Sequence, residues 1–178
     1  MEAYEKWLKD IETLRLPRYE DLSNIPLYLD QILEYINDAL GTLFVFDESI
    51  LTQAMINNYV KQKAVPAPIK KRYDKEHMVY IIAITILKQI MNIQYITKGS
   101  EVILSTYGVE DGYNMFIDYV EESMRFTLGE IYGSKRQFKE HREDVLAIPL
   151  KAATLAFAGK IFADYSFKNL LMKQKDDE

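Results

Sequence analysis

Residues 51–78 read LTQAMINNYVKQKAVPAPIKKRYDKEHM and hold the strongest local signals in the chain. Thr52 is a good N-cap, because its hydroxyl can accept a hydrogen bond from an amide of the first helical turn. The apolar residues that follow recur at helical spacing: Met55, Ile56, Tyr59 and Val60. The sequence therefore predicts a helix over 52–63 with one packed face and one free face.

Amide and lysine side chains make up the predicted free face. Gln53, Asn57 and Lys61 lie four residues apart, and Asn58 lies beside them. Asn and Gln amides can bond adenine bidentately in the major groove, and Lys can reach phosphate or guanine. This chemistry suits the reading of base edges, although an exposed polar face is also the ordinary condition of a surface helix.

The chain cannot continue this helix through Val65-Pro66-Ala67-Pro68, because proline lacks an amide hydrogen and disfavours helix in the residue before it. Three consecutive cations follow in a segment short enough for only a turn or a tiny hairpin: Lys70, Lys71 and Arg72. We expect these three cations to contact DNA phosphates, and we expect Lys63 to belong to the same DNA-binding surface. Asp74 is expected to cap the next helix.

Charge is distributed unevenly along the chain. Residues 57–77 carry six lysine or arginine side chains against two carboxylates, whereas the whole chain has a formal net charge of −5. Nucleic acid would be repelled by the body of such a protein, so binding would have to occur at this basic island. On charge alone, a lysine-rich solvated face is the competing interpretation.

These residues resemble a known family of DNA-binding proteins. The order of segments in this region is similar to the MerR-type winged helix-turn-helix. The segments are 52–59, 65–68, 71–78, an apolar helix to Met91, and 92–96. The resemblance implies a recognition helix that ends in an aromatic residue, then a leucine-proline turn and an arginine-x-tyrosine exit from the wing. A third helix and a short fourth one complete the motif.

A second resemblance covers about half of the chain. Residues 16–96, which begin Leu16-Pro17-Arg18-Tyr19 and include the run MINNYVK at 55–61, are similar to a bacterial family known as domain of unknown function 1836. That family implies no activity. The chain departs from the MerR pattern in having Asn57 in place of an arginine, Lys63 in place of a glycine, a truncated wing, and residues 41–50 ahead of Thr52.

Segments of helical period dominate the whole sequence, and we expect an all-α fold. This fold is predicted to be a helix bundle with a MerR-like winged helix-turn-helix in its N-terminal half. The expected helices cover 2–14, 25–40, 52–63, 74–91, 100–108, 111–128 and 144–172. The helix over 74–91 is apolar nearly all round, so we expect it to be the central helix of the N-terminal half.

The chain is expected to divide into a helix-turn-helix half, residues 1–99, a helical half, residues 100–173, and a disordered tail, residues 174–178. The last helix mixes large apolar residues with small ones: Ala152, Ala156, Ala158, Gly159 and Ala163. Such a pattern suits a buried spine or a dimer seam. We expect the C-terminal half to serve dimerisation or the sensing of a small-molecule effector, which the sequence does not identify.

Composition argues against several other classes. The chain has no cysteine, its charged N-terminus is unlike a secretory signal, and its longest uncharged apolar stretch, residues 78–87, is too short to span a bilayer. The two histidines, His77 and His141, are too few for a histidine-based triad or a His-rich zinc site. No phosphate-binding loop or nucleophile elbow occurs. We expect a cytoplasmic protein with no enzymatic activity, cofactor, metal or membrane partner.

The sequence therefore predicts a DNA-binding transcriptional regulator. It would be a homodimer on double-stranded DNA, reading the major groove with the helix over 52–63 and phosphates with the basic turn over 69–73. The alternative is an all-α protein-interaction adaptor that keeps the helix-turn-helix shape without binding DNA. Asn57 separates the two hypotheses, since it either faces outward or bonds the loop over 44–49.

Overall fold

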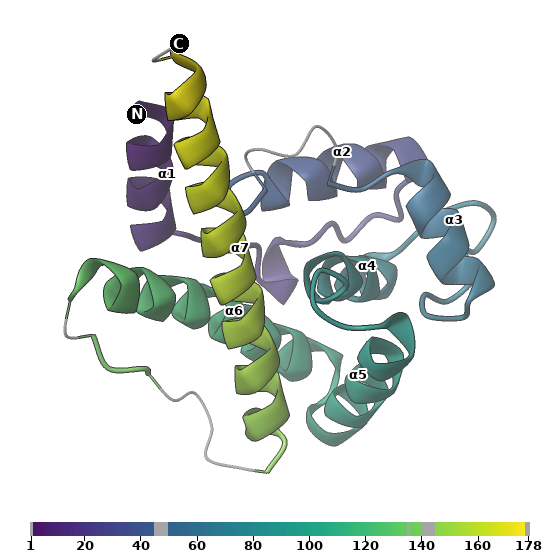
Figure 1. The fold of residues 1–178 in the computed structure, drawn as a ribbon. Helices are drawn as coiled ribbons and strands as arrows, with labels where there is room; N and C mark the ends of the chain where they lie inside the picture. The colour runs from purple at the N-terminus through teal and green to yellow at the C-terminus, as the bar shows by residue number, and fades with distance from the viewer. Residues whose placement is uncertain (1, 45–49, 135, 140–144, 177–178) are drawn as a thin grey trace.

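The protein is described here by a computed structural model that places residues 2–44, 50–134, 136–139 and 145–176 (Figure 1). Within these ranges the fold is all-helical, as predicted, and β-structure is limited to two isolated bridges. The helices are α1 (Glu2–Glu12), the short 3-10 helix η1 (Tyr19–Asp21), α2 (Leu29–Leu40), α3 (Gln53–Lys61), α4 (Lys75–Leu87), α5 (Ile93–Tyr107), α6 (Val109–Tyr132) and α7 (Ala147–Asp176).

The centre of the fold is α4. Every residue from Ile81 to Leu87 is buried, and the helix has no polar face. The helices α5, α6 and α7 all pack against it. The long helices α6 and α7 cross each other, α3 lies on the opposite side of α4 from α7, and α2 runs above α4 from near α7 toward α3 (Figure 1). The prediction that this apolar segment is core is confirmed.

The two predicted halves share one core. In α1, the Trp7 ring lies 5.0 Å from the Phe162 ring and 4.7 Å from the Tyr165 ring, both in α7. The buried residues form a single cluster that runs from Tyr4 to Tyr165. The predicted boundary at residue 99 falls inside α5. The N-terminal helix therefore packs with the C-terminal half.

Several helix boundaries differ from those expected. The helix α5 begins at Ile93 because Asn92 caps it, its side chain accepting from the Tyr95 amide at 3.1 Å, so the expected start at Ser100 is wrong. Pro26 and an antiparallel bridge between Leu27 and Tyr73 delay the start of α2 until Leu29. Gly108 separates α5 from α6, which begins at Val109 rather than at Asp111.

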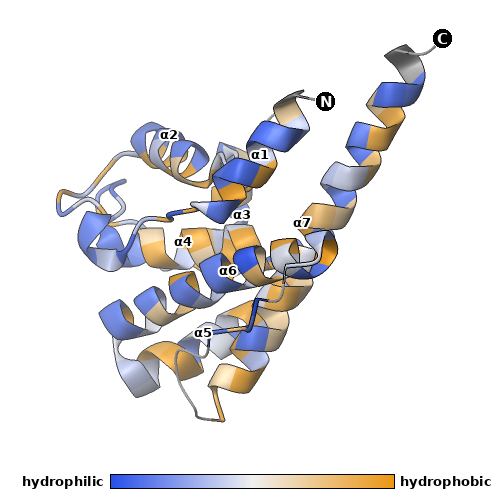
Figure 2. Cartoon of the chain, turned by 90° about the vertical axis from the view of Figure 1, so that its left-hand side faces the viewer, coloured by the Kyte–Doolittle hydropathy of each residue, from blue (hydrophilic) through white to orange (hydrophobic). Residues whose placement is uncertain are grey.

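The C-terminal helix, α7, ends later than predicted. It continues to Asp176, into the stretch 174–178 that was expected to be disordered. Its last third extends past the other helices (Figure 2). Four large apolar side chains are exposed there: Phe167, Leu170, Leu171 and Met172.

Buried charge attaches the segment before η1 to α6. The Glu121 side chain, 2% exposed, accepts a hydrogen bond from the Leu16 amide at 2.7 Å. It also pairs with Arg18 at 3.1 Å and with Arg125 at 3.3 Å. Arg125 in turn donates to the Leu14 carbonyl at 3.0 Å. This network fixes the extended residues 14–18 along the helix.

Removal of the Glu121 carboxylate is expected to destabilise the fold. Glu121→Ala would leave the Leu16 amide without its acceptor and would remove a buried carboxylate from Arg18 and Arg125, which keep Asp118 and Glu122 respectively, at a cost of about 3 kcal/mol in the free energy of unfolding. Denaturant unfolding measures this change. The control is Glu130→Ala, an exposed position on the same helix, for which we expect a change within about 0.5 kcal/mol. Equal effects in the two variants would contradict the role of the network.

A candidate nucleic-acid interface

The helix α3 has the two faces that the sequence predicts. The Thr52 hydroxyl accepts a hydrogen bond from the Met55 amide at 3.3 Å and so caps the helix. Ile56 and Tyr59 are buried against the core. The predicted site residues of the polar face are all exposed: Gln53, Asn57, Asn58 and Lys61. The polar face is therefore open to solvent.

The end of α3 is a Schellman motif with a lysine at its left-handed position. The Lys63 amide donates to the Val60 carbonyl at 3.0 Å, and the Ala64 amide donates to the Tyr59 carbonyl at 2.9 Å. Lys63 has φ of 59°, a conformation that usually belongs to glycine at this point. The backbone thus adopts the turn that a glycine would give, while the residue adds an exposed cation.

The predicted basic turn is a two-residue hairpin. The Ile69 amide donates to the Arg72 carbonyl at 3.0 Å, and the Arg72 amide donates to the Ile69 carbonyl at 3.0 Å. The two residues at the tip, Lys70 and Lys71, have φ of 51° and 64°. Both central residues are therefore left-handed, as in a type I′ turn, where Asn-Gly is the preferred pair.

Left-handed backbone is confined to glycines and to this basic region within the described residues. The non-glycine residues with positive φ are Lys63, Lys70 and Lys71. A side chain with a Cβ costs about 1 kcal/mol in this conformation, and a long charged side chain gains nothing from it locally. Strain of this kind is a reason to look for a function at these residues.

The Arg72 side chain makes its contacts within the protein. Its guanidinium lies 4.3 Å from the centroid of the Tyr28 ring, donates to the Tyr28 hydroxyl at 2.9 Å and donates to the Pro26 carbonyl at 3.3 Å. The neighbouring Tyr73 exchanges two backbone hydrogen bonds of 2.8 Å with Leu27. Arg72 thus anchors the hairpin to the segment before α2, and Lys70 and Lys71 are the cations at the tip.

Asp74 and His77 hold the other end of the hairpin. The Asp74 side chain accepts from the amides of Glu76 and His77, which confirms the predicted cap of α4. The imidazole of His77 bridges Asp74 at 2.6 Å and the Ala67 carbonyl at 3.3 Å. Partial burial acts to raise the pKa of Asp74, but the hydrogen bonds from His77 and Glu76 outweigh it and lower that pKa.

Four of the eight predicted site residues line two grooves. Asn57 and Lys71 line a groove of about 470 Å³ between α3, the hairpin and the start of α2. Lys61 and Lys63 line a second groove of about 420 Å³ beside the loop that follows α3. Gln53 and Asn58 lie on the exposed face of α3 and line neither groove.

The described residues were compared with the requirements of a metal site and of a membrane-spanning helix. These residues contain no cluster of three or more histidine, aspartate or glutamate side chains that could hold a metal ion. His141 lies outside the described residues. None of the described helices is long and apolar enough to cross a bilayer.

Sequence reasoning missed two features of this site. The stacking of Arg72 on Tyr28 joins residues 44 positions apart, and no local pattern marks it. The left-handed conformation of the lysines is equally hidden, since lysine has no preference for it. The sequence gives one indication of the hairpin. Few residues separate Pro68 from Asp74, and so short a segment leaves room only for a tight turn.

The fold and the site define an α-helical protein with a small basic hairpin beside an exposed polar helix. A family described as domain of unknown function DUF1836 matches residues 17–119, which cover more than half of the chain. The chain belongs to this family. No curated protein and no solved structure matches the chain.

Relief of the strain at the hairpin tip is expected to stabilise the fold. Replacing Lys70 by Asn and Lys71 by Gly supplies the preferred type I′ pair, and we expect a gain of about 1 kcal/mol in the free energy of unfolding. The control replaces both lysines by Ala, which removes the charges and retains the strain. Thermal or denaturant unfolding of the three proteins tests this, and a control that gains as much as the Asn-Gly variant would contradict it.

Proposed function

We propose that this protein binds double-stranded DNA as a homodimeric regulator of transcription. In this proposal α3 lies in the major groove, and the hairpin over 69–72 contacts phosphates. The observation that carries the proposal is the position of two strained, exposed lysines, Lys70 and Lys71, beside the open amide face of α3. The strain is unfavourable for the fold alone, and it places positive charge at the tip of the hairpin.

The chemistry of the exposed face supports this proposal. Gln53, Asn57 and Asn58 offer amides that pair with base edges, and Lys61 adds a cation at the end of the same helix. None of the nine residues of α3 is acidic. The contrast with the overall charge of −5 would direct a polyanion to this region of the surface.

The order of elements also supports a MerR-like arrangement. A helix containing Tyr59 is followed by the Val65-Pro66 turn, a hairpin that exits through Arg72-Tyr73, and two more helices. The resemblance to MerR-type proteins implies this order. Because Arg72 is held by Tyr28, the phosphate contacts in this proposal fall to Lys70 and Lys71 at the hairpin tip, and to Lys61 and Lys63 at the end of α3.

A specific observation favours the alternative, a protein-interaction adaptor. Three apolar or aromatic side chains are exposed around the same hairpin: Ile25 at 71%, Tyr28 at 47% and Ile69 at 68%. Exposed apolar groups of this kind suit a protein partner better than a phosphate backbone. The adaptor would bind its protein partner with the hairpin and the segment before α2. Because its net charge is negative, it would bind DNA weakly or not at all.

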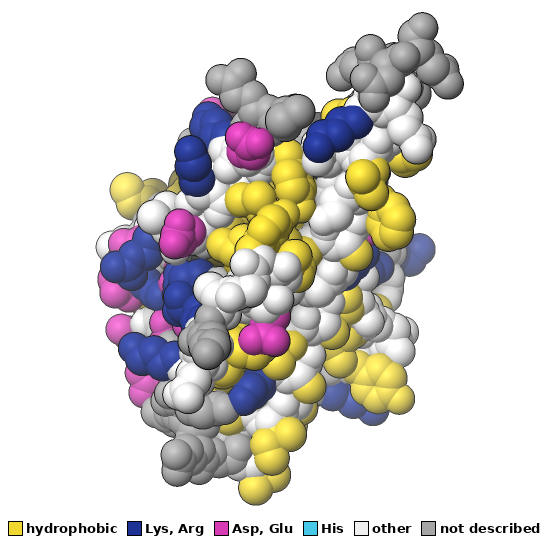
Figure 3. Space-filling model, turned by 60° about the vertical axis from the view of Figure 1, so that its left-hand side comes forward, with side chains coloured by type: hydrophobic (Ala, Val, Ile, Leu, Met, Phe, Trp, Pro, Cys, Tyr) yellow, Lys and Arg dark blue, Asp and Glu magenta, His cyan; other side chains and the backbone are white. Residues whose placement is uncertain are grey.

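The end of α7 supports the homodimer. Phe167 and Leu170 are 66% and 55% exposed, and Leu171 and Met172 lie beside them on the extended part of the helix. Hydrophobic side chains also follow this part of the surface in the space-filling view (Figure 3). A second copy of the chain would cover these side chains and present two reading helices to two half-sites.

DNA binding is tested first with a labelled duplex of mixed sequence at several salt concentrations. We expect the wild type to bind, and we expect the salt slope to fall by about two when Lys70 and Lys71 are replaced. The Asn-Gly and Ala-Ala variants are expected to lose the same slope although they differ in stability. Absence of salt-dependent retention by the wild type would remove the DNA hypothesis and leave the adaptor.

Sequence reading is tested at Asn57. After selection of a preferred duplex from a random pool, Asn57→Ala is expected to weaken that complex roughly tenfold to a hundredfold, and to change mixed-sequence binding little. Gln94→Ala, an exposed amide on α5, is the control and is expected to have no effect. Because Asn57 is exposed, the melting temperature of the Asn57→Ala variant is expected to equal that of the wild type. A loss of stability without a loss of specific affinity would count against a recognition role.

Dimerisation is tested by sedimentation of the wild type and of a variant with Phe167→Glu and Leu170→Glu. We expect a dimer for the wild type and a monomer for the variant, because two carboxylates in an apolar contact would be desolvated without partners. The matched control, Ala3→Glu with Thr13→Glu, adds the same two carboxylates at exposed positions in α1 and directly after it, and is expected to remain a dimer. A monomeric wild type at tens of micromolar would overturn the proposal.

A further inference from the structure

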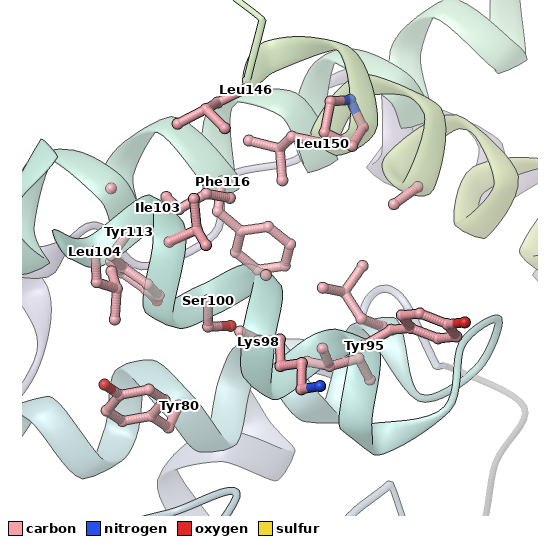
Figure 4. Close-up of a pocket in the computed structure, with 18 of the residues that line it drawn as sticks. Tyr80, Tyr95, Lys98, Ser100, Ile103, Leu104, Tyr113, Phe116, Leu146 and Leu150 are labelled. Carbon is pink, nitrogen blue, oxygen red and sulfur yellow. The ribbon is translucent and has the colours of Figure 1, made fainter. Parts of the chain in front are cut away.

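A second functional feature lies away from the hairpin. A half-open groove of about 430 Å³ separates α5 from the first turns of α7. Figure 4 shows the Phe116 ring of α6 between Leu146 and Leu150 on one side and Lys98 and Ser100 of α5 on the other. A volume of this size is within the range that holds small-molecule ligands.

The walls of the groove are almost entirely apolar. They come from α4, α5, α6 and the start of α7. The apolar character includes Tyr95, which lines the groove and is 68% exposed. A long apolar body would therefore stay in contact with the protein from the floor of the groove to its mouth.

The charge of the lining is one-sided. Lys98 is the one ionisable side chain among the lining residues apart from tyrosines, and no carboxylate lines the groove. Within the described residues, no ion pair involves Lys98. An anion at this end of the groove would therefore meet a cation without a competing partner.

Ser100 also differs from the other small hydroxyl residues of α5. Thr97, Ser105 and Thr106 each donate to a backbone carbonyl of the helix, at 2.8 Å, 3.0 Å and 2.8 Å. Ser100 is half-buried at the groove, and its hydroxyl makes no such bond within the described structure. Its hydroxyl thus remains available to a ligand, and Figure 4 shows Ser100 next to the Lys98 side chain at the groove.

Gly99 is an exposed residue of α5 and one of the residues that line the groove. A Cβ added at this residue would meet no atom within 4 Å. Glycine inside a helix costs about 1 kcal/mol relative to alanine, and packing does not require it here. A larger side chain at this position would occupy space next to the mouth of the groove.

We propose that this groove binds a monocarboxylic acid with a long apolar body. The carboxylate accepts hydrogen bonds from the Lys98 amine and the Ser100 hydroxyl, and the body lies against Phe116 and the leucines of α7. Each oxygen of a carboxylate has lone pairs for such donors, and an apolar chain replaces water along the walls. The site and its ligand do not depend on DNA binding.

The test uses cis-parinaric acid, whose fluorescence rises in apolar surroundings, and its methyl ester, which has the same body without the charge. Both are titrated into the full chain. We expect the acid to bind about tenfold more tightly than the ester. Lys98→Gln is expected to bring the acid to the affinity of the ester and to leave the ester unchanged. Equal binding of acid and ester to the wild type, or no binding of either, would overturn the proposal.

Two further variants locate the site. Gly99→Leu is expected to reduce the binding of both compounds at least tenfold. Its melting temperature is expected to stay the same or to rise, because nothing lies within 4 Å of the added Cβ and leucine favours a helix more than glycine does. Lys9→Gln removes an exposed lysine of α1 and is expected to change neither affinity. If Lys9→Gln weakens the acid as much as Lys98→Gln does, the effect reports net charge and the assignment to this groove fails.

Discussion

A helix without a polar face has to be enclosed, and α4 imposes this requirement on the rest of the molecule. Its buried run from Ile81 to Leu87 is covered by α5, α6 and α7. The first turn of the same helix is held to the hairpin, because His77 bonds both Asp74 and Ala67 and lies 5.5 Å from the Tyr73 ring. Burial of α4 therefore also fixes where the basic hairpin stands.

The fold was predictable wherever local chemistry decides it. The caps at Thr52 and Asp74 follow from the preference of an orphaned amide for a side-chain oxygen, and both were expected from the sequence. The start of α5 at Ile93 was not expected, because Gly99 followed by Ser100 looks like a helix break followed by an N-cap. The helix continues through them, and Asn92 supplies the cap one residue before Ile93.

The candidate site was predictable only in part. The exposed face of α3 follows from helical spacing, because burial of Ile56 and Tyr59 leaves Asn57 outside. Contacts between distant segments do not follow from spacing. The contact of Arg72 with Tyr28 changes Arg72 from a free cation into an anchor, and the groove beside Lys98 requires four helices to meet. No periodicity in one segment contains that information.

The hairpin tip has a consequence for how this sequence can drift. A lysine codon becomes an asparagine codon through a single base change, and asparagine tolerates the left-handed backbone of Lys70 and Lys71 better than lysine does. Mutation alone would therefore reach a more relaxed turn easily. If stability were the only requirement, lysine would be less favoured than asparagine at both positions. A family member with asparagine at these positions would therefore indicate that its function does not require positive charge at the hairpin tip.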